Sequence, residues 1–225
     1  MAAPAIAATN TSQQTGEISS HVVKLPASIA AGDLLIAFFA YGPPSAGGDT
    51  TITWPAGWTQ LFTQFLAGTQ ELEARYRIAD GGEGTTITLT TGAGRVSAHA
   101  SYRITGHHTV TAPAVGVTVT GSSTGANPPS LNPAGWDIED TLWIAVASCQ
   151  SGSNIFTGFP TSYSLSQLTV NGNNIQLGVA ARALSAASDD PGTFTNPNAG
   201  WIAQTIAVRP AGAAASTARS YGWVA

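Results

Sequence analysis

Charged side chains are scarce in this sequence. They make up 9% of the 225 residues, whereas an average soluble domain has about 25%. Disordered chains combine high charge with low hydrophobicity, but hydrophobic residues here reach 43%, so the chain is expected to fold. Its surface must then consist mainly of neutral polar and small residues. Such a surface suits a protein that packs against neighbours, and it also suits an adhesin.

Cysteine and lysine are nearly absent as well. Cys149 is the single cysteine, which excludes an internal disulfide framework. It ends the apolar run Leu142–Cys149, so we interpret it as a buried core thiol rather than a reactive one. Lys24 is the only lysine, and the formal net charge is −4. Without a cluster of basic residues, nucleic acid is not an expected partner.

Targeting and membrane signals are missing too. Residues 1–8 contain no basic stretch followed by a long apolar run, so we expect no signal peptide. No segment approaches the ~20 apolar residues that a membrane-spanning helix needs. We therefore expect neither secretion through a cleaved leader nor a membrane partner.

What the sequence does contain is a succession of strand patterns separated by turns. Glycine occurs 25 times and proline 13 times, and no segment keeps a helical period over three turns. The run Leu34–Tyr41 is almost entirely apolar, as in a strand that is buried on both faces. Residues 85–91 alternate threonine with apolar residues, which predicts one buried face. Residues 115–120 alternate in the same way and predict another strand.

A weak internal repeat organises these strands. The segment Trp54–Trp58 (WPAGW) precedes a strand pattern in the first half, and Phe159–Tyr163 (FPTSY) does so in the second. The apolar runs Leu34–Tyr41 and Leu142–Cys149 also correspond. These features predict an all-β, antiparallel, jelly-roll-like β-sandwich with two similar halves, residues 20–105 and 127–210.

The domain organisation follows from the repeat. No polar, flexible linker separates the halves, so we predict one domain over residues 1–210 and a C-terminal tail over 211–225. Two arrangements stay open: the halves interleave in one sandwich with a pseudo-two-fold axis, or they form two small tandem sandwiches. We favour the single sandwich.

The repeat also separates packing residues from candidates for function. Five of the six tryptophans align with an apolar residue of the other half, which indicates packing rather than sugar stacking. These alignments are Trp54 with Phe159, Trp58 with Tyr163, Trp136 with Ile29, Trp143 with Ile36 or Leu35, and Trp201 with Val96. Trp223 has no counterpart and is a candidate anchor on a neighbouring subunit.

Histidines and carboxylates supply no convincing catalytic or metal site. We interpret His107-His108 as an exposed loop pair, since adjacent strand residues point to opposite faces and cannot share a metal. His99 is interpreted as a hydrogen-bonded strand histidine. Glu71 and Glu73 are expected to form a charged strip on a solvated strand face, continued by two arginines of the same strand, Arg75 and Arg77.

The remaining acids and the missing motifs complete this interpretation. A retaining glycosidase needs two carboxylates about 5–5.5 Å apart, a spacing that Glu71 and Glu73 could approach, but nothing else supports an acid/base pair. Asp33 and Asp140 each precede an apolar run and are expected to cap turns. No nucleophile elbow, phosphate loop or metal motif is present. We therefore expect no enzyme activity, no cofactor and no metal.

Several segments of the first half form a recognisable set: Gly32–Leu35 at the start of a strand, Pro55–Trp58 before the next, and Tyr76–Ala79 with Gly82-Glu83 before a threonine-rich strand. Together they resemble a widespread group of phage and prophage proteins. The resemblance covers residues 20–105 best, because the second half lacks the Gly-Trp and Gly-Glu pairs. It implies a β-sandwich component of a tailed-phage particle, such as a capsid decoration, head-fibre or tail appendage protein.

The sequence thus predicts a structural protein exposed on a virion and assembled in the host cytoplasm, in contact with other virion proteins and with copies of itself. The candidate partner-binding residues are Tyr221, Trp223, His107 and His108. We expect the tail to clamp neighbours by strand addition, so that deletion of residues 211–225 impairs incorporation. The alternative is a carbohydrate- or receptor-binding domain of a fibre, with a host surface glycan as partner, and a third hypothesis is a polysaccharide depolymerase.

Overall fold

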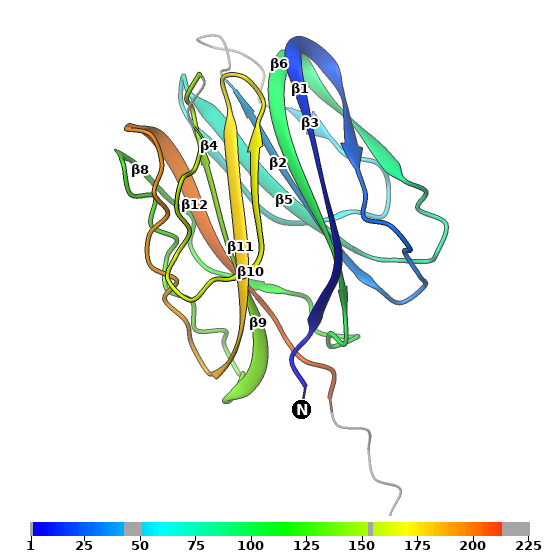
Figure 1. Cartoon of the computed structure of the whole chain (residues 1–225). Helices are drawn as coiled ribbons and strands as arrows, with labels where there is room; N and C mark the ends of the chain where they lie inside the picture. Colours follow the sequence, from blue (N-terminus) through cyan, green and yellow to red (C-terminus); the bar gives the residue numbers. More distant parts are fainter. Residues whose placement is uncertain (1, 43–50, 153–154, 213–225) are drawn as a thin grey trace, which may run out of the picture.

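The computed structural model describes residues 2–42, 51–152 and 155–212. These residues form two antiparallel β-sheets stacked as two layers (Figure 1), so the predicted all-β sandwich is confirmed. The described part of the chain includes no helix with the length and hydropathy needed to span a bilayer. Tyr221, Trp223 and nearly all of the predicted tail lie outside the described residues.

The first half of the chain builds one layer, which we call the N-terminal sheet. Its strands are β1 (Ala5–Lys24), β2 (Leu34–Gly42), β3 (Ile52–Thr53), β4 (Thr59–Leu66), β5 (Gln70–Ile78) and β6 (Thr86–Thr105). They lie in the order β1-β6-β2-β5-β4, and β3 pairs with β6. The predicted strand at residues 85–91 is confirmed as the first part of β6: Thr86, Thr88 and Thr90 are exposed on one face, and Leu89 and Thr91 are buried on the other.

The second half builds the other layer, the C-terminal sheet. Its strands are β7 (Ala114–Val115), β8 (Val119–Ser123), β9 (Glu139–Cys149), β10 (Leu165–Asn171), β11 (Gln176–Ala186) and β12 (Ala199–Val208). The strand order is β10-β11-β9-β12-β7, and β8 also pairs with β12. The first four strands correspond one by one to β4-β5-β2-β6 of the other layer. Each half therefore keeps its strands in its own sheet, and the halves stack instead of exchanging strands.

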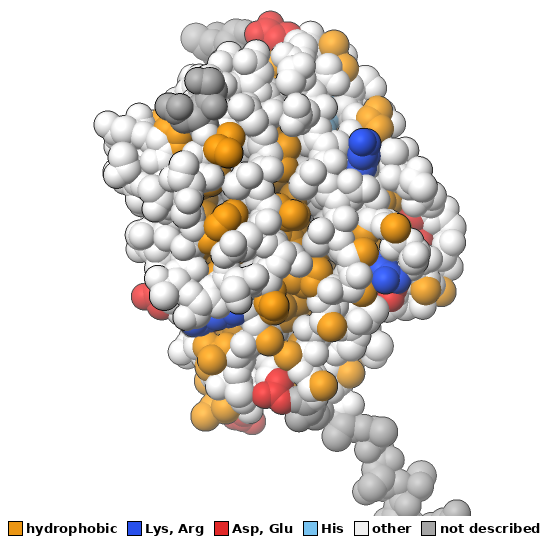
Figure 2. Space-filling model, viewed as in Figure 1, with side chains coloured by type: hydrophobic (Ala, Val, Ile, Leu, Met, Phe, Trp, Pro, Cys, Tyr) orange, Lys and Arg blue, Asp and Glu red, His pale blue; other side chains and the backbone are white. Residues whose placement is uncertain are grey.

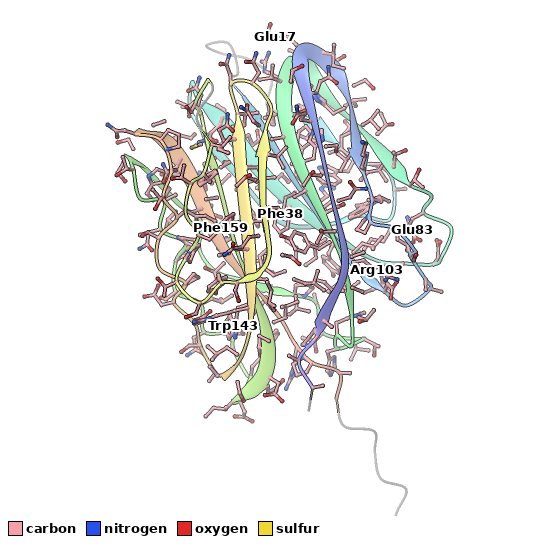
Figure 3. All side chains as sticks on the ribbon, in the orientation of Figure 1. Glu17, Phe38, Glu83, Arg103, Trp143 and Phe159 are labelled. Carbon is pink, nitrogen blue, oxygen red and sulfur yellow. The ribbon has the colours of Figure 1, made fainter. Side chains whose placement is uncertain are left out.

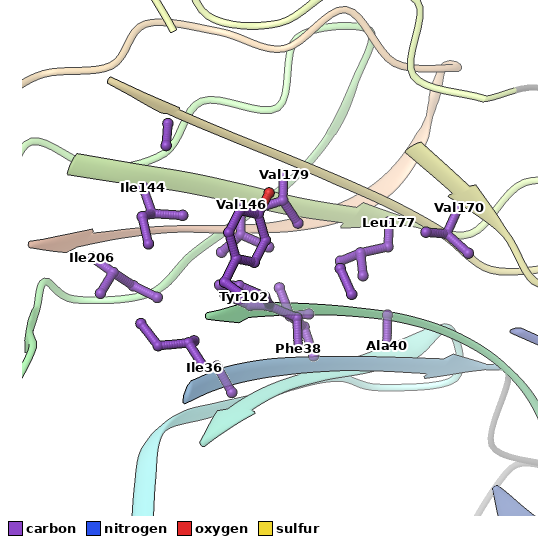
Figure 4. Packing of buried hydrophobic residues seen from close by; sticks show 14 of the residues in the cluster. Ile36, Phe38, Ala40, Tyr102, Ile144, Val146, Val170, Leu177, Val179 and Ile206 are labelled. Atoms are coloured by element: carbon purple, nitrogen blue, oxygen red, sulfur yellow. The ribbon is translucent and has the colours of Figure 1, made fainter. Parts of the chain in front are cut away.

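The two sheets share one apolar core (Figure 4). Alternate residues of β2, among them Ile36 and Phe38, face Ile144 and Val146 of β9 across the interlayer space. Tyr102 of β6 reaches across the layers, packs edge-on against Phe38 and donates a hydrogen bond to the Ser166 carbonyl at 2.9 Å. Residues distant in sequence thus stabilise one common interior.

Each sheet also buries its outer face. A second cluster, which includes Trp143 and Tyr163, lies outside the C-terminal sheet beneath the loops of the second half. A third, which includes Phe39 and Trp54, lies outside the N-terminal sheet. It also contains residues from the last part of β1 and the first part of β6, which pair with each other. Figure 3 shows Phe38 between the layers and Trp143 on the side of the C-terminal sheet. Burial on both faces explains why β2 has no exposed residue, as the sequence predicted.

The tryptophans follow the same plan. Trp54, Trp58, Trp143 and Trp201 are all buried in the outer clusters, and Trp136 packs against the outer cluster of the C-terminal sheet. The prediction that these rings serve packing is confirmed. The alignment of Trp201 with Val96 is wrong in detail, because Val96 faces the shared core and Trp201 faces outward.

The strand predicted at residues 115–120 is interrupted. Val115 ends β7 and Val119 begins β8. Between them, the Gln204 side-chain amide donates to the Gly116 carbonyl at 3.0 Å and to the Thr118 hydroxyl at 2.9 Å. The Gln204 side chain of β12 thus replaces the backbone partner that a neighbouring strand would supply. The predicted strand is therefore divided into β7 and β8.

Candidate functional site

His107 and His108 join the ends of the two halves. The His107 backbone forms a bridge with Pro210, and the His108 amide donates to the Arg209 carbonyl at 2.9 Å. The sequence-based interpretation of the two histidines as an exposed loop pair is wrong for His107, which is only 5% exposed. Its two ring nitrogens have no hydrogen-bond partner among the described residues. Burial lowers the His107 pKa, while the nearby Asp33 carboxylate opposes that shift.

His108 closes a turn. Its Nδ1 accepts hydrogen bonds from the amides of Thr111 at 3.0 Å and Val110 at 3.4 Å. The pair therefore pins the connection between the halves, and its role in partner binding stays a prediction. Any contact there would come through half-buried His108 and fully exposed neighbours such as Val110.

Glu71 and Glu73 correct the sequence-based interpretation most clearly. They were expected on a solvated face, but they are 5% and 3% exposed. Glu71 accepts hydrogen bonds from the Tyr41 hydroxyl at 2.6 Å and the Thr63 hydroxyl at 2.8 Å. The strip fails as a prediction because Tyr41, Thr63 and Trp54, which come from other parts of the chain, contact these carboxylates. The local alternation of residues does not reveal such contacts.

Glu73 is held by different donors. Trp54 Nε1 donates to its Oε2 at 3.0 Å, and Arg75 Nε donates to its Oε1 at 2.6 Å. Burial raises the pKa of both glutamates, and their hydrogen bonds oppose the shift. Every carboxylate oxygen of the pair already has a donor from the fold. This arrangement can stabilise the sheet.

A chain of hydrogen bonds connects two buried histidines on the same face. His99 Nδ1 lies 2.9 Å from the Ser12 hydroxyl, and His99 Nε2 lies 2.7 Å from the Ser97 hydroxyl. His21 Nδ1 lies 2.7 Å from the same Ser97 oxygen, and His21 Nε2 lies 3.1 Å from the Thr91 hydroxyl. His99 also stacks on Phe39. The prediction of a hydrogen-bonded strand histidine at position 99 is confirmed.

The Gly-Glu pair of the first half forms a closed turn. Glu83 accepts hydrogen bonds from the amides of Asp80 at 2.7 Å and Gly81 at 3.0 Å, and from Arg77 Nε at 3.0 Å. Figure 3 places Glu83 on the outer side of the N-terminal sheet. All of its polar contacts are local, so this motif serves the turn.

Two aspartates were expected to cap turns. Asp33 does so, since its carboxylate accepts from the Ala30 amide at 2.9 Å and lies 3.3 Å from Arg103 Nη1. Asp140 instead lies within β9, opposite Ser185 of β11. A hydrogen bond from the Ser185 side chain is the main cause of its lowered pKa. Cys149 is fully buried, as expected, and burial raises its pKa to about 12.

No family model, curated protein or solved structure matches the chain. Among the described residues, no group of three or more His, Cys, Asp or Glu is placed to hold a metal ion. The function therefore has to be argued from the surface of this molecule.

The free edges of the sheets are the most distinctive feature of that surface. β1 and β4 end the N-terminal sheet, and β10 ends the C-terminal sheet on one side. β4 and β10 carry no charged residue and no proline, and in β1 only Glu17, His21 and Lys24 are ionisable. Natural sheets usually protect an edge with charge, proline or bulges. Here the register shifts in β1 leave the stretch Ala8–Gln14 regular and uncharged.

Proposed function

We propose that this protein is a structural component of a tailed-phage particle, exposed on the particle surface as a capsid decoration, head-fibre or tail appendage protein. The observation that carries the proposal is the set of uncharged, proline-free edge strands in both sheets. Such edges can accept a strand from a neighbouring chain. The backbone N–H and C=O groups on their outer side pair with no other strand among the described residues.

The surface composition supports the same role. Figure 2 shows a face on which charged side chains are few and separate, amid a broad neutral surface. Five arginines are paired with carboxylates: Arg75 with Glu73, Arg77 with Asp80 and Glu83, Arg103 with Asp33, Arg182 with Asp189, and Arg209 with Glu139. A neutral surface allows close packing in an assembly without desolvating many charges.

The assignment to a phage particle, rather than to another assembly, rests on the resemblance of residues 20–105 to phage proteins. In this chain the motifs behind that resemblance serve the fold: Glu83 closes a turn, and Trp58 packs in the outer cluster of the N-terminal sheet. They support a shared architecture, and the edges supply the means of association.

The test is to purify tailed particles on a density gradient from a host that carries this sequence and to analyse them by quantitative peptide mass spectrometry. We expect the chain to band with the particles at a copy number comparable to other structural proteins. Particles that band and infect normally without the chain would contradict the proposal. A washing step in high salt distinguishes a bound component from a contaminant.

A further inference from the structure

A polar hollow opens beside the outer cluster of the C-terminal sheet. Its volume of about 440 Å³ lies within the range of about 300–1,000 Å³ that is usual for small-ligand sites. Two short segments, residues 130–132 and 188–190, form most of its wall. The complete lining is Ser130, Leu131, Asn132, Arg182, Leu184, Ser188, Asp189 and Asp190.

The two segments are joined by a short antiparallel bridge. The Leu131 amide donates to the Asp189 carbonyl at 2.8 Å, and the Asp189 amide donates to the Leu131 carbonyl at 2.9 Å. In such a pair, the residues on either side of the bridge point to the opposite face from the bridged residues. Leu131 is buried in the outer cluster. The flanking side chains of both segments therefore share the outward face.

The base of the hollow is rigid. The Asp189 carboxylate accepts a hydrogen bond from Arg182 Nε at 2.9 Å and another from the Tyr163 hydroxyl. The Arg182 guanidinium also lies over the Tyr163 ring, 5.0 Å from its centre. These contacts neutralise the buried carboxylate and fix the bridge. A preformed wall lowers the conformational entropy that the protein would otherwise lose on binding a ligand.

The flanking side chains are free to bind. Ser130, Asn132, Ser188 and Asp190 make no hydrogen bond or ion pair with the described residues, and all four are exposed. They offer two hydroxyls, one amide and one carboxylate, which together provide both donors and acceptors. Leu184 adds apolar surface to the lining.

The first half has a related hydrogen bond with fewer polar side chains around it. Leu25 is also buried in an outer cluster, and its amide donates to the Thr85 carbonyl at 2.8 Å. The residues that flank this hydrogen bond are Lys24, Pro26, Gly84 and Thr86. Two of them are polar, whereas all four residues that flank the bridge of the second half are polar.

We propose that this hollow binds a neutral saccharide. Sugar hydroxyls both donate and accept, which matches the mixed set of free groups, and a sugar ring can lay its C–H face against Leu184. An anion is disfavoured, because the two aspartates outnumber the one arginine, whose charge already pairs with Asp189. A metal ion is disfavoured because no group of metal ligands is present among the described residues. This activity goes beyond a structural role and does not depend on it.

The test is an NMR titration of the ¹⁵N-labelled full chain with the methyl glycosides of glucose, galactose, mannose and N-acetylglucosamine. We expect at least one glycoside to shift the amide signals of residues 130–132 and 188–190. The variants Asn132→Ala and Asp190→Ala are expected to weaken that binding at least tenfold. Both side chains are exposed, so the spectra of the two variants should otherwise keep the wild-type pattern.

The matched controls are Asn127→Ala and Asp137→Asn, which alter exposed side chains outside the hollow and should bind as the wild type does. The proposal is overturned if no glycoside shifts these signals at its solubility limit, if the shifts map elsewhere, or if calcium chloride alone reproduces them. Incorporation of Asp190→Ala into particles, measured in parallel, tests the structural role separately.

Discussion

Ser97 lies between two histidines and has one hydroxyl proton to donate. At one end of this series of hydrogen bonds, the Thr91 hydroxyl donates to the Ala93 carbonyl, so the Thr91 oxygen accepts from His21 Nε2–H. His21 Nδ1 must then accept from Ser97, whose oxygen in turn accepts from His99 Nε2–H. The contacts are all satisfied when both rings are neutral and carry their proton on Nε2.

The first residue-scale prediction concerns pH. Burial lowers the pKa of His21 to about 4 and that of His99 to about 3, from 6.5. Between about pH 4 and 6.5 the unfolded chain therefore binds more protons, so the free energy of unfolding falls as the pH falls, by up to about 1.4 kcal/mol per pH unit for each histidine. Long-range ¹H–¹⁵N NMR spectra at pH 5 should show two neutral Nε2–H rings.

A variant isolates this contribution from the buried glutamates, whose raised pKa values act in the opposite direction in the same acidic range. In urea unfolding measured across pH 4–6.5, His21→Gln should show a flatter dependence on pH than the wild type. Val22→Gln, at an exposed neighbouring position of β1, should keep the wild-type slope. Imidazolium signals from either histidine at pH 5 would contradict the network.

The sequence predicted some of these residues and not others, for a physical reason. Cys149 and His99 lie within strand patterns that already indicate burial, so their surroundings could be inferred locally. Glu71 and Glu73 look like a solvated strip, because alternation along β5 indicates which residues share a face but not what covers that face. Their donors, Tyr41, Thr63 and Trp54, come from other elements of the sheet and of the layer outside it.

At the scale of elements, the edge strand β1 has the clearest consequence for association. It pairs with β6 on one side, and the regular stretch Ala8–Gln14 has no charge to repel a neighbouring strand. Lysine on an edge is a common natural protection against strand addition. Lysine side chains on this edge of β1 should therefore prevent a strand of a neighbouring molecule from pairing with it.

The element-scale prediction uses the double variant Ala7→Lys/Gln13→Lys at exposed positions of β1. Gln13 lies in the regular stretch, and Ala7 lies at the register shift just before it. We expect the wild type to sediment as an oligomer and this variant as a monomer in sedimentation velocity experiments. Ala134→Lys/Ser164→Lys adds the same charge in exposed loops and should stay oligomeric. Equal sedimentation of the edge variant and the wild type would show that β1 is not the interface.

At the scale of the whole molecule, the two halves share no sheet. They are held together by side chains of the common core and by backbone hydrogen bonds at the ends of the halves. Each sheet is built by one half, yet its inner face is buried by the other. Unfolding one half would therefore expose the inner face of the other, including Phe38 and Ile144. This architecture favours a single cooperative transition.

The whole-molecule prediction is that Phe38→Ala lowers the free energy of unfolding by about 3–5 kcal/mol, the usual range for truncating a buried phenylalanine. Tryptophans lie in both outer clusters, so fluorescence reports on both layers. Fluorescence and far-UV circular dichroism should give one coincident transition. Phe65→Ala, on exposed β4, should change the free energy by only about 0.5 kcal/mol. Two separate transitions would indicate tandem, independent domains.

The sequence by itself determined the class of fold and the repeat, because period-two alternation, apolar runs and turn residues act locally along each strand. The tertiary structure alone decided that each half keeps its own sheet, that Glu71 and Glu73 are buried against Tyr41, Thr63 and Trp54, and that the segments around Leu131 and Asp189 meet at a polar hollow. Those outcomes depend on contacts between residues far apart in the chain, and no local pattern encodes which elements will cover one another.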